Sequence, residues 1–68
     1  MVKAENFTAM KGHVSHGQKI LAPSGKVYEL RNTIAGWNVN GPDGRPCSGN
    51  LTSAADVEFY VVNGLGSI

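Results

Sequence analysis

Residues 57–62 have the sequence VEFYVV, and the conformation of this stretch decides the fold. Three valines and two adjacent aromatic side chains are typical of a strand, and six residues suit a strand better than a helix. Valine also loses side-chain freedom in a helix, because its branched Cβ crowds the preceding turn. We therefore expect a final strand over residues 57–62. The alternative is one helix over residues 53–62, which would place Val57, Tyr60 and Val61 on one side.

The residues just before this stretch carry a helix-start signal. Ser53 is followed three residues later by Asp56, a spacing close to that of a capping box. We expect one helical or 3₁₀ turn over residues 53–56, directly before the final strand.

Proline and glycine mark two turns earlier in the chain. The sequence Ala22-Pro23-Ser24-Gly25 favours a type I turn, which would join short strands at 19–22 and 26–31 into a hairpin. The sequence at 41–44 (GPDG) favours a second hairpin turn. Its returning strand, 45–48, is expected to be short or at a sheet edge, because Pro46 lacks an N–H donor.

Two further strands are expected, at 5–10 and 33–39, separated from each other by the loop 12–18 and the first hairpin. Gly36 falls inside the second of these strands. A glycine in that position indicates a bulge or a close approach of another backbone segment.

Together these signals predict a mainly β fold of five or six short strands, with one short helical turn before the last. We expect a small antiparallel sheet or a partly closed barrel, and the layout across residues 5–62 resembles that of SH3-like barrels. No SH3 ligand-binding motif can be matched, so the resemblance implies nothing about peptide binding. Residues 1–68 are expected to form a single small domain, with 1–4 and 64–68 as flexible tails.

Composition limits the classes of function. The chain is 41% hydrophobic and 16% charged, which is typical of a folded domain. Its formal charge is +1, and its six Lys and Arg residues are spread from Lys3 to Arg45, so a dedicated nucleic-acid binder is not favoured. We find neither a secretory signal nor an apolar segment of membrane-spanning length, and we expect a cytoplasmic protein that does not contact a membrane.

Three side chains are candidate metal ligands or reactive groups. His13 and His16 are three residues apart, and Cys47 would be a third ligand if the loops converged. A structural zinc site usually needs four closely paired ligands. Cys47 would need a nearby base or positive charge to act as a nucleophile, and Arg45 is the only close candidate in sequence. We expect no bound metal, no cofactor and no enzymatic activity.

The segment 57–62 is apolar on both faces of the expected strand, which suggests an interaction surface. One face would fill the core, and the other would contact a second molecule. We predict a homo-oligomer interface formed by Val57, Phe59, Val61 and Val62. The alternative is that the N-terminal strand or residues 64–68 cover the second face.

A second set of residues is predicted to bind a partner or ligand. Arginine pairs with phosphate or carboxylate groups and tryptophan stacks on bases. The set consists of Lys26, Arg31, Trp37, Arg45 and Tyr60. The alternative is that Trp37 belongs to the core and that scattered charges surround it.

The first functional hypothesis is a non-enzymatic binding protein that acts as a homo-oligomer. In its style it is similar to the accessory proteins with which phages inhibit or redirect host macromolecules. The second hypothesis is a sponge that sequesters a nucleotide-like ligand in a pocket between subunits. The third is weak binding of nucleic acid.

Overall fold

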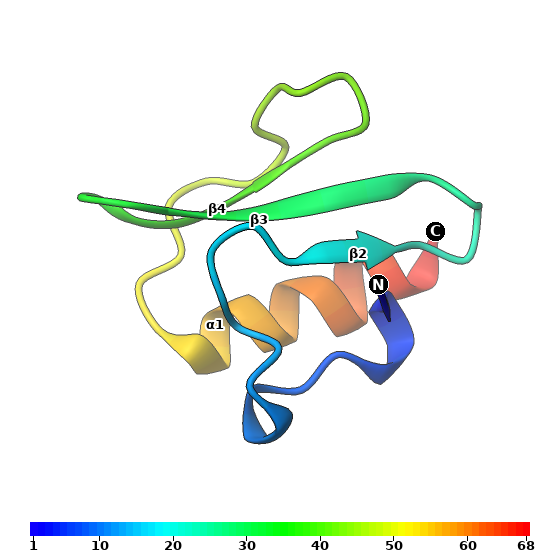
Figure 1. The fold of residues 1–68 in the computed structure, drawn as a ribbon, viewed down its shortest axis with the longest axis horizontal. Coiled ribbons are helices and arrows are strands. Elements are labelled where there is room, and N and C mark those ends of the chain that lie inside the picture. Colours follow the sequence, from blue (N-terminus) through cyan, green and yellow to red (C-terminus); the bar gives the residue numbers. More distant parts are fainter.

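A computed structural model describes all 68 residues and shows a four-stranded sheet with a helical segment packed against one face (Figure 1). The strands follow one another in the sheet in chain order: β1 (Val2–Lys3), β2 (Lys19–Leu21), β3 (Val27–Thr33) and β4 (Gly36–Asn40). The C-terminal helical segment consists of α1 (Ala54–Phe59), the π-helical turn η3 (Tyr60–Gly64) and the 3₁₀ turn η4 (Leu65–Ser67). Two more 3₁₀ turns, η1 (Ala4–Asn6) and η2 (Ala9–Lys11), lie between β1 and β2. No helix is both long enough and apolar enough to cross a bilayer.

The sheet is mixed and open, so the prediction of a partly closed barrel of five or six strands is wrong. β1 pairs in parallel with β2, and only β2–β3 and β3–β4 are antiparallel. The strand predicted at 5–10 is replaced by 3₁₀ turns, and the one predicted at 45–48 is reduced to a single bridge between Pro46 and Asn40. The sheet does not close, because the helical segment covers the inner face that a barrel would enclose.

Both turns marked by proline and glycine are confirmed. In the first, the Gly25 N–H donates to the Ala22 carbonyl oxygen at 2.9 Å, and β2 and β3 flank the turn. In the second, the Gly44 N–H donates to the Gly41 carbonyl oxygen at 3.0 Å. A turn of this kind is set by local backbone preferences, which is why the sequence predicts it well.

The strand predicted at 33–39 is interrupted by a third turn. Ile34 and Ala35 form the loop between β3 and β4, with Thr33 paired to Gly36 across it. Gly36 has φ +124°, and a Cβ placed on it would lie 2.6 Å from the Leu51 carbonyl oxygen. The predicted close backbone approach at Gly36 is therefore confirmed, although the residue begins a strand rather than lying within one.

Residues 57–62 are helical, and the prediction of a strand there is wrong. Val57, Val61 and Leu65 are spaced four apart and are 0%, 0% and 4% exposed, so burial against the sheet overrides the strand preference of valine. In an α-helix, residues spaced four apart drift slowly around the helix, because one turn contains 3.6 residues. A turn of the wider π-helix contains more residues and shifts the next residue back in the opposite direction. The π-helical turn η3 thus keeps Leu65 on the face occupied by Val57 and Val61.

The helix begins where the sequence predicts. Ser53 is the N-cap, and its Oγ accepts a hydrogen bond from the Asp56 N–H at 3.1 Å. The expected single turn over 53–56 is only the start of a longer helical segment. It continues because each following turn adds a buried apolar residue.

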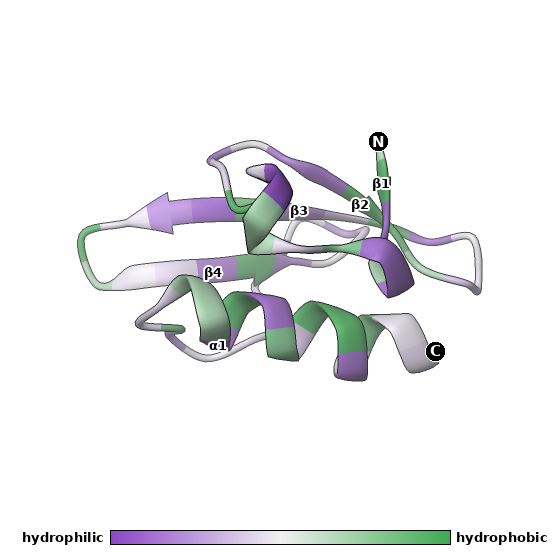
Figure 2. Ribbon diagram, turned by 90° about the horizontal axis from the view of Figure 1, so that it is seen from below, coloured by the Kyte–Doolittle hydropathy of each residue, from purple (hydrophilic) through white to green (hydrophobic).

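The core lies between the sheet and the helical segment. Figure 2 shows this segment beneath the sheet, with hydrophobic and hydrophilic positions alternating along its length. Ala4 and Leu65, which lie in the segments 1–4 and 64–68 that were predicted to be flexible tails, belong to the core. The ten buried residues are Ala4, Phe7, Ile20, Ala22, Tyr28, Leu30, Val39, Val57, Val61 and Leu65.

Candidate binding groove on the helix

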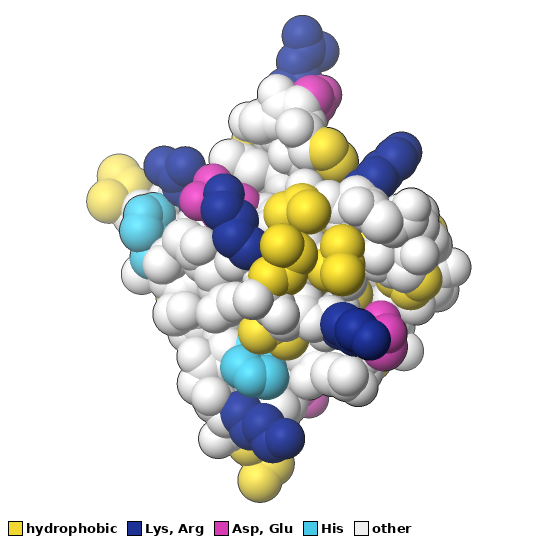
Figure 3. Space-filling view, turned by 45° about the vertical axis from the view of Figure 1, so that its right-hand side comes forward, with side chains coloured by type: hydrophobic (Ala, Val, Ile, Leu, Met, Phe, Trp, Pro, Cys, Tyr) yellow, Lys and Arg dark blue, Asp and Glu magenta, His cyan; other side chains and the backbone are white.

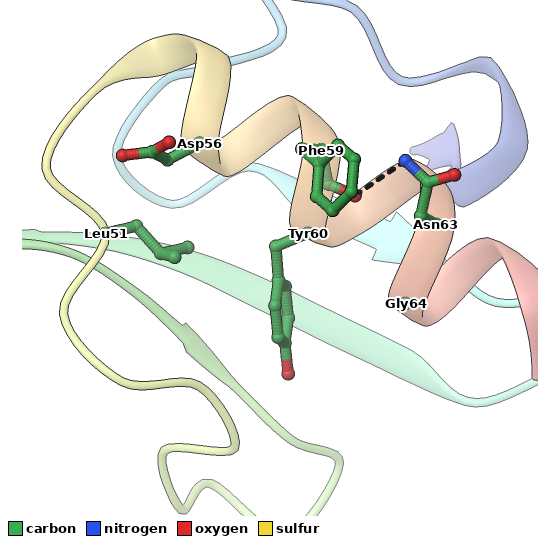
Figure 4. Close-up of a pocket in the computed structure, with 6 residues that line it drawn as sticks. All are labelled: Leu51, Asp56, Phe59, Tyr60, Asn63 and Gly64. Carbon is green, nitrogen blue, oxygen red and sulfur yellow. Dashed lines mark hydrogen bonds between the residues drawn. The ribbon is translucent and has the colours of Figure 1, made fainter.

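The outer side of the helical segment carries an open groove of about 420 Å³ (Figure 4). One wall comes from the loop before α1 and the rest from α1 and η3. The groove is lined by Leu51, Asp56, Phe59, Tyr60, Asn63 and Gly64. We call this surface the helix groove.

Leu51 is held in the groove wall by paired backbone hydrogen bonds to β4. The Trp37 N–H donates to the Leu51 carbonyl oxygen and the Leu51 N–H donates to the Trp37 carbonyl oxygen, both at 2.8 Å. The backbone of Gly36 fits directly beneath this contact because it has no side chain. The loop is thereby fixed to the sheet at the point where it passes the helix.

Tyr60 points from the helix toward the loop that carries Cys47 (Figure 4). Its hydroxyl donates to the Cys47 carbonyl oxygen at 3.1 Å and lies 3.6 Å from the Cys47 Sγ. Burial, followed by the hydrogen bond to Cys47, raises the pKa of Tyr60 to about 12. The phenol is therefore neutral at physiological pH and acts as a structural donor that ties the loop to the helix.

Phe59 is the most exposed aromatic side chain of the molecule. It is 70% exposed, whereas Val57 and Val61 on the same segment are fully buried. Its carbonyl oxygen accepts a hydrogen bond from the Asn63 Nδ2 at 3.2 Å, shown dashed in Figure 4. Burying a phenylalanine side chain is worth about 1.5–3 kcal/mol, so covering Phe59 with a partner would be favourable.

The C-terminal part of the chain, which carries the groove, contains acidic but no basic side chains. Asp56 lines the groove, where its Oδ2 accepts a hydrogen bond from the Thr52 Oγ1 at 3.1 Å. Residues 46–68 contain Asp56 and Glu58 but no Lys or Arg. The helix groove therefore combines apolar and aromatic walls with an acidic margin.

The structure divides the predicted interface residues into two groups. The protein's own core buries Val57 and Val61 completely, so their side chains do not lie on the surface of the subunit. Phe59 is exposed, and Val62 is half-buried against the edge of the core. The predicted ligand-binding residue Tyr60 lies in the helix groove beside Phe59.

The other predicted ligand-binding residues are not brought together. Trp37 packs partly buried against the core, on the face of β4 that carries Val39. Arg31 lies on the opposite face of the sheet, 3.3 Å from Glu29. Arg45 and Lys26 are exposed near the ends of two different hairpins. Within one subunit, Trp37 and these cations do not share a pocket.

The candidate metal ligands each have a role within the fold. The Nδ1 of His13 accepts from the Thr8 N–H at 3.1 Å, and that of His16 accepts from the Asn32 N–H at 2.9 Å. The Cys47 thiol donates to the Val39 carbonyl oxygen at 3.3 Å. No group of three or more His, Cys, Asp or Glu side chains is placed to hold a metal ion.

Four groove residues, Leu51, Asp56, Asn63 and Gly64, were not predicted from the sequence. If residues 57–62 had been assigned to a helix, Asp56 and Asn63 could have been predicted as groove residues. On a helix surface Asp56 is a neighbour of Tyr60, and Asn63 is a neighbour of Phe59. Leu51 could not have been found in this way, because its position depends on its pairing with Trp37. No family model matches the chain, and no curated protein or solved structure is found to be similar to it.

Proposed function

We propose that this chain is a non-enzymatic binding protein that docks a partner protein in the helix groove. The observation that carries the proposal is the 70% exposure of Phe59 above a groove with apolar walls. Exposed apolar surface rimmed by polar residues is typical of interaction sites. Aromatic side chains that fill or cover a pocket contribute strongly to binding between proteins.

The chemistry of the groove indicates what kind of segment would fit. Phe59 and Leu51 favour an apolar side chain, and the Asp56 carboxylate at the margin favours a neighbouring lysine or arginine. We infer a partner surface that presents an apolar side chain beside a basic one.

Binding rather than catalysis is supported by the way the polar groups of the groove are used. Tyr60 donates to Cys47, Asp56 accepts from Thr52, and Asn63 donates to a helix carbonyl. Each of these bonds orders the groove itself. Such a protein would act by occupying a macromolecule, in the manner of the phage accessory proteins that it resembles in style.

The test compares the proteins retained by three immobilised forms: the wild type, Phe59→Ser and Ile34→Ser. Ile34 is the matched control, because it is also an exposed apolar residue but lies at the tip of the β3–β4 hairpin. We expect a partner that Phe59→Ser loses and Ile34→Ser retains. If both variants retain the same proteins as the wild type, the groove is not the binding site and the proposal fails.

A further inference from the structure

The outer face of the sheet, opposite the helical segment, is formed by the side chains that alternate with the buried ones. Ile20, Tyr28 and Leu30 point inward, so their neighbours along β2 and β3 point outward. In the strand register, Lys3, Leu21 and Val27 form one row across this face. Lys19 and Glu29 are partners in the next row.

Leu21 and Val27 give this outer face an apolar centre. Leu21 is half-buried, and Val27 is 36% exposed. Figure 3 shows a hydrophobic patch on the surface with Lys and Arg side chains around it. We call the row Lys3, Leu21 and Val27, together with the exposed turn residue Lys26 that directly precedes Val27, the basic sheet patch.

The two lysines of this patch make no ion pair within the chain. Lys19 and Arg31 each lie 3.3 Å from a Glu29 carboxylate oxygen, and these contacts, chiefly the one with Lys19, lower the pKa of Glu29. Lys3 and Lys26 are exposed and make no ion pair within 4.0 Å, although the exposed Glu5 lines the same surface hollow as Lys3. Their charge is therefore available to a partner molecule.

The charge of the chain is distributed unevenly along the sequence. Residues 1–45 carry all six Lys and Arg residues against three acids, whereas residues 46–68 carry two acids and no base. The apolar helix groove thus has an acidic margin, and the apolar sheet patch has a basic one. The sheet patch offers the chemistry that the helix groove favours, an apolar side chain beside a lysine.

We propose that the occupant of the helix groove is the basic sheet patch of a second copy of this chain. Leu21 and Val27 of one copy would cover Phe59 of the next, with Lys26 near Asp56. This inference rests on the proposed function, because it names the partner of the same groove. The contact is head-to-tail, since it joins two different surfaces of the same molecule, and it can continue from copy to copy.

Charge favours this arrangement over a symmetric dimer. A groove-to-groove contact would bring the Asp56 carboxylates of two copies into one interface, and like charges in an interface oppose association. A patch-to-patch contact would do the same with Lys3 and Lys26. Only the head-to-tail contact places the acidic groove margin of one copy against the lysines of the next.

Size limits the strength of the contact. The subunit exposes 4017 Å², and a stable interface commonly buries about 800 Å² on each partner, which is about one fifth of that surface. The groove and the patch are each smaller than a full face of the molecule. We therefore expect association that depends on protein concentration and weakens as salt screens the charge pairs.

The experiment measures mass against protein concentration by analytical ultracentrifugation at low salt. The variants are Asp56→Lys and Lys26→Glu, with Arg45→Glu as a control of equal charge change on the distant hairpin, and circular dichroism verifies that each variant is folded. We expect the wild type to associate, each of the first two variants to associate about five-fold more weakly, and Arg45→Glu to behave as the wild type. A one-to-one mixture of Asp56→Lys with Lys26→Glu should associate again with the two variants alternating, because each groove then meets a patch of opposite charge on the other variant.

A wild type that stays monomeric at all concentrations overturns the inference. So does association of Asp56→Lys that is as strong as that of the wild type, which would mean that the groove does not meet a basic surface, or a mixture of the two variants that does not associate. If the wild type is monomeric but a foreign partner is still lost with Phe59→Ser, only the self-association fails and the proposed binding function stands.

Discussion

Glu58 joins the helix to the N-terminal part of the chain: its Oε1 accepts a hydrogen bond from the Ala9 N–H at 2.7 Å. Ala9 opens the 3₁₀ turn η2, so its N–H has no partner within that turn. The carboxylate therefore satisfies a backbone donor 49 residues away in sequence. Together with the burial of Val57, this bond fixes α1 in a chain that has few other side-chain hydrogen bonds between distant segments.

Replacing Glu58 by alanine is expected to lower the free energy of unfolding by about 1–2 kcal/mol, because the Ala9 N–H loses its charged acceptor. Glu58→Gln keeps an acceptor oxygen and should lose less. Urea unfolding followed by Trp37 fluorescence measures both. The control is Glu5→Ala, which removes an exposed carboxylate and should leave the midpoint close to that of the wild type. Equal midpoints for Glu58→Ala and the wild type would contradict the structural role of the bond.

The helical conformation of 57–62 predicts that two neighbouring apolar residues differ sharply in their effect on stability. Val61 is fully buried and Phe59 is 70% exposed. Val61→Ala should lower the free energy of unfolding by about 2 kcal/mol, since it leaves a cavity, and Phe59→Ala should change it by less than about 0.5 kcal/mol. In a strand these two side chains would share a face. Similar losses for both variants, measured by urea unfolding, would therefore argue against the helix.

The sequence predicts those parts of the fold that local backbone preferences determine. Pro23 with Gly25 and Pro42 with Gly44 mark real turns, and Ser53 marks a real helix start, because each acts within four residues of itself. The strand content is less predictable: residues 5–10 form 3₁₀ turns, and residues 45–48 form only one bridge to β4, where Pro46 has no N–H to donate.

The conformation of VEFYVV could not be settled by local preference, because its valines favour a strand and their burial favours a helix. The decisive signal is non-local. Val57, Val61 and Leu65 recur every four residues, but Leu65 lies in a stretch that its glycines make similar to a flexible tail. The candidate site follows the same division: Phe59 and Tyr60 are recognisable as exposed aromatic candidates, whereas Leu51 depends on its pairing with Trp37.

Gly36 is expected to be the glycine least tolerant of a side chain. An alanine there would have to keep φ near +124°, and its Cβ would lie 2.6 Å from the Leu51 carbonyl oxygen. We expect Gly36→Ala to lower the free energy of unfolding by about 2–3 kcal/mol and to disturb the groove wall at Leu51. Gly49→Ala is the matched control, because its Cβ would meet nothing within 4 Å and its φ is not positive. Urea midpoints compare the two, and equal midpoints would show that the close approach at Leu51 is not tight.

Tyr60 predicts how stability depends on pH at the alkaline end. Its pKa in the folded protein is raised from the ordinary 10.0 to about 12, first by burial and then by the hydrogen bond to Cys47. The folded state therefore holds the phenolic proton more tightly than the unfolded state, in which tyrosine ionises near pH 10. The resulting stability is complete below about pH 10 and is lost as the pH rises from about 10 to about 12.

Urea midpoints of the wild type and of Tyr60→Phe, measured from neutral pH to about pH 12, test this dependence. We expect the stability of the wild type relative to Tyr60→Phe to fall across the alkaline range, because only the wild type has this phenol to ionise. Cys47→Ser should retain most of the fall, since burial is the larger cause of the shift and the carbonyl acceptor remains. Wild type and Tyr60→Phe that lose stability in parallel would mean that Tyr60 ionises as easily in the folded protein as in the unfolded chain, and that its hydroxyl does not hold the Cys47 loop to the helix.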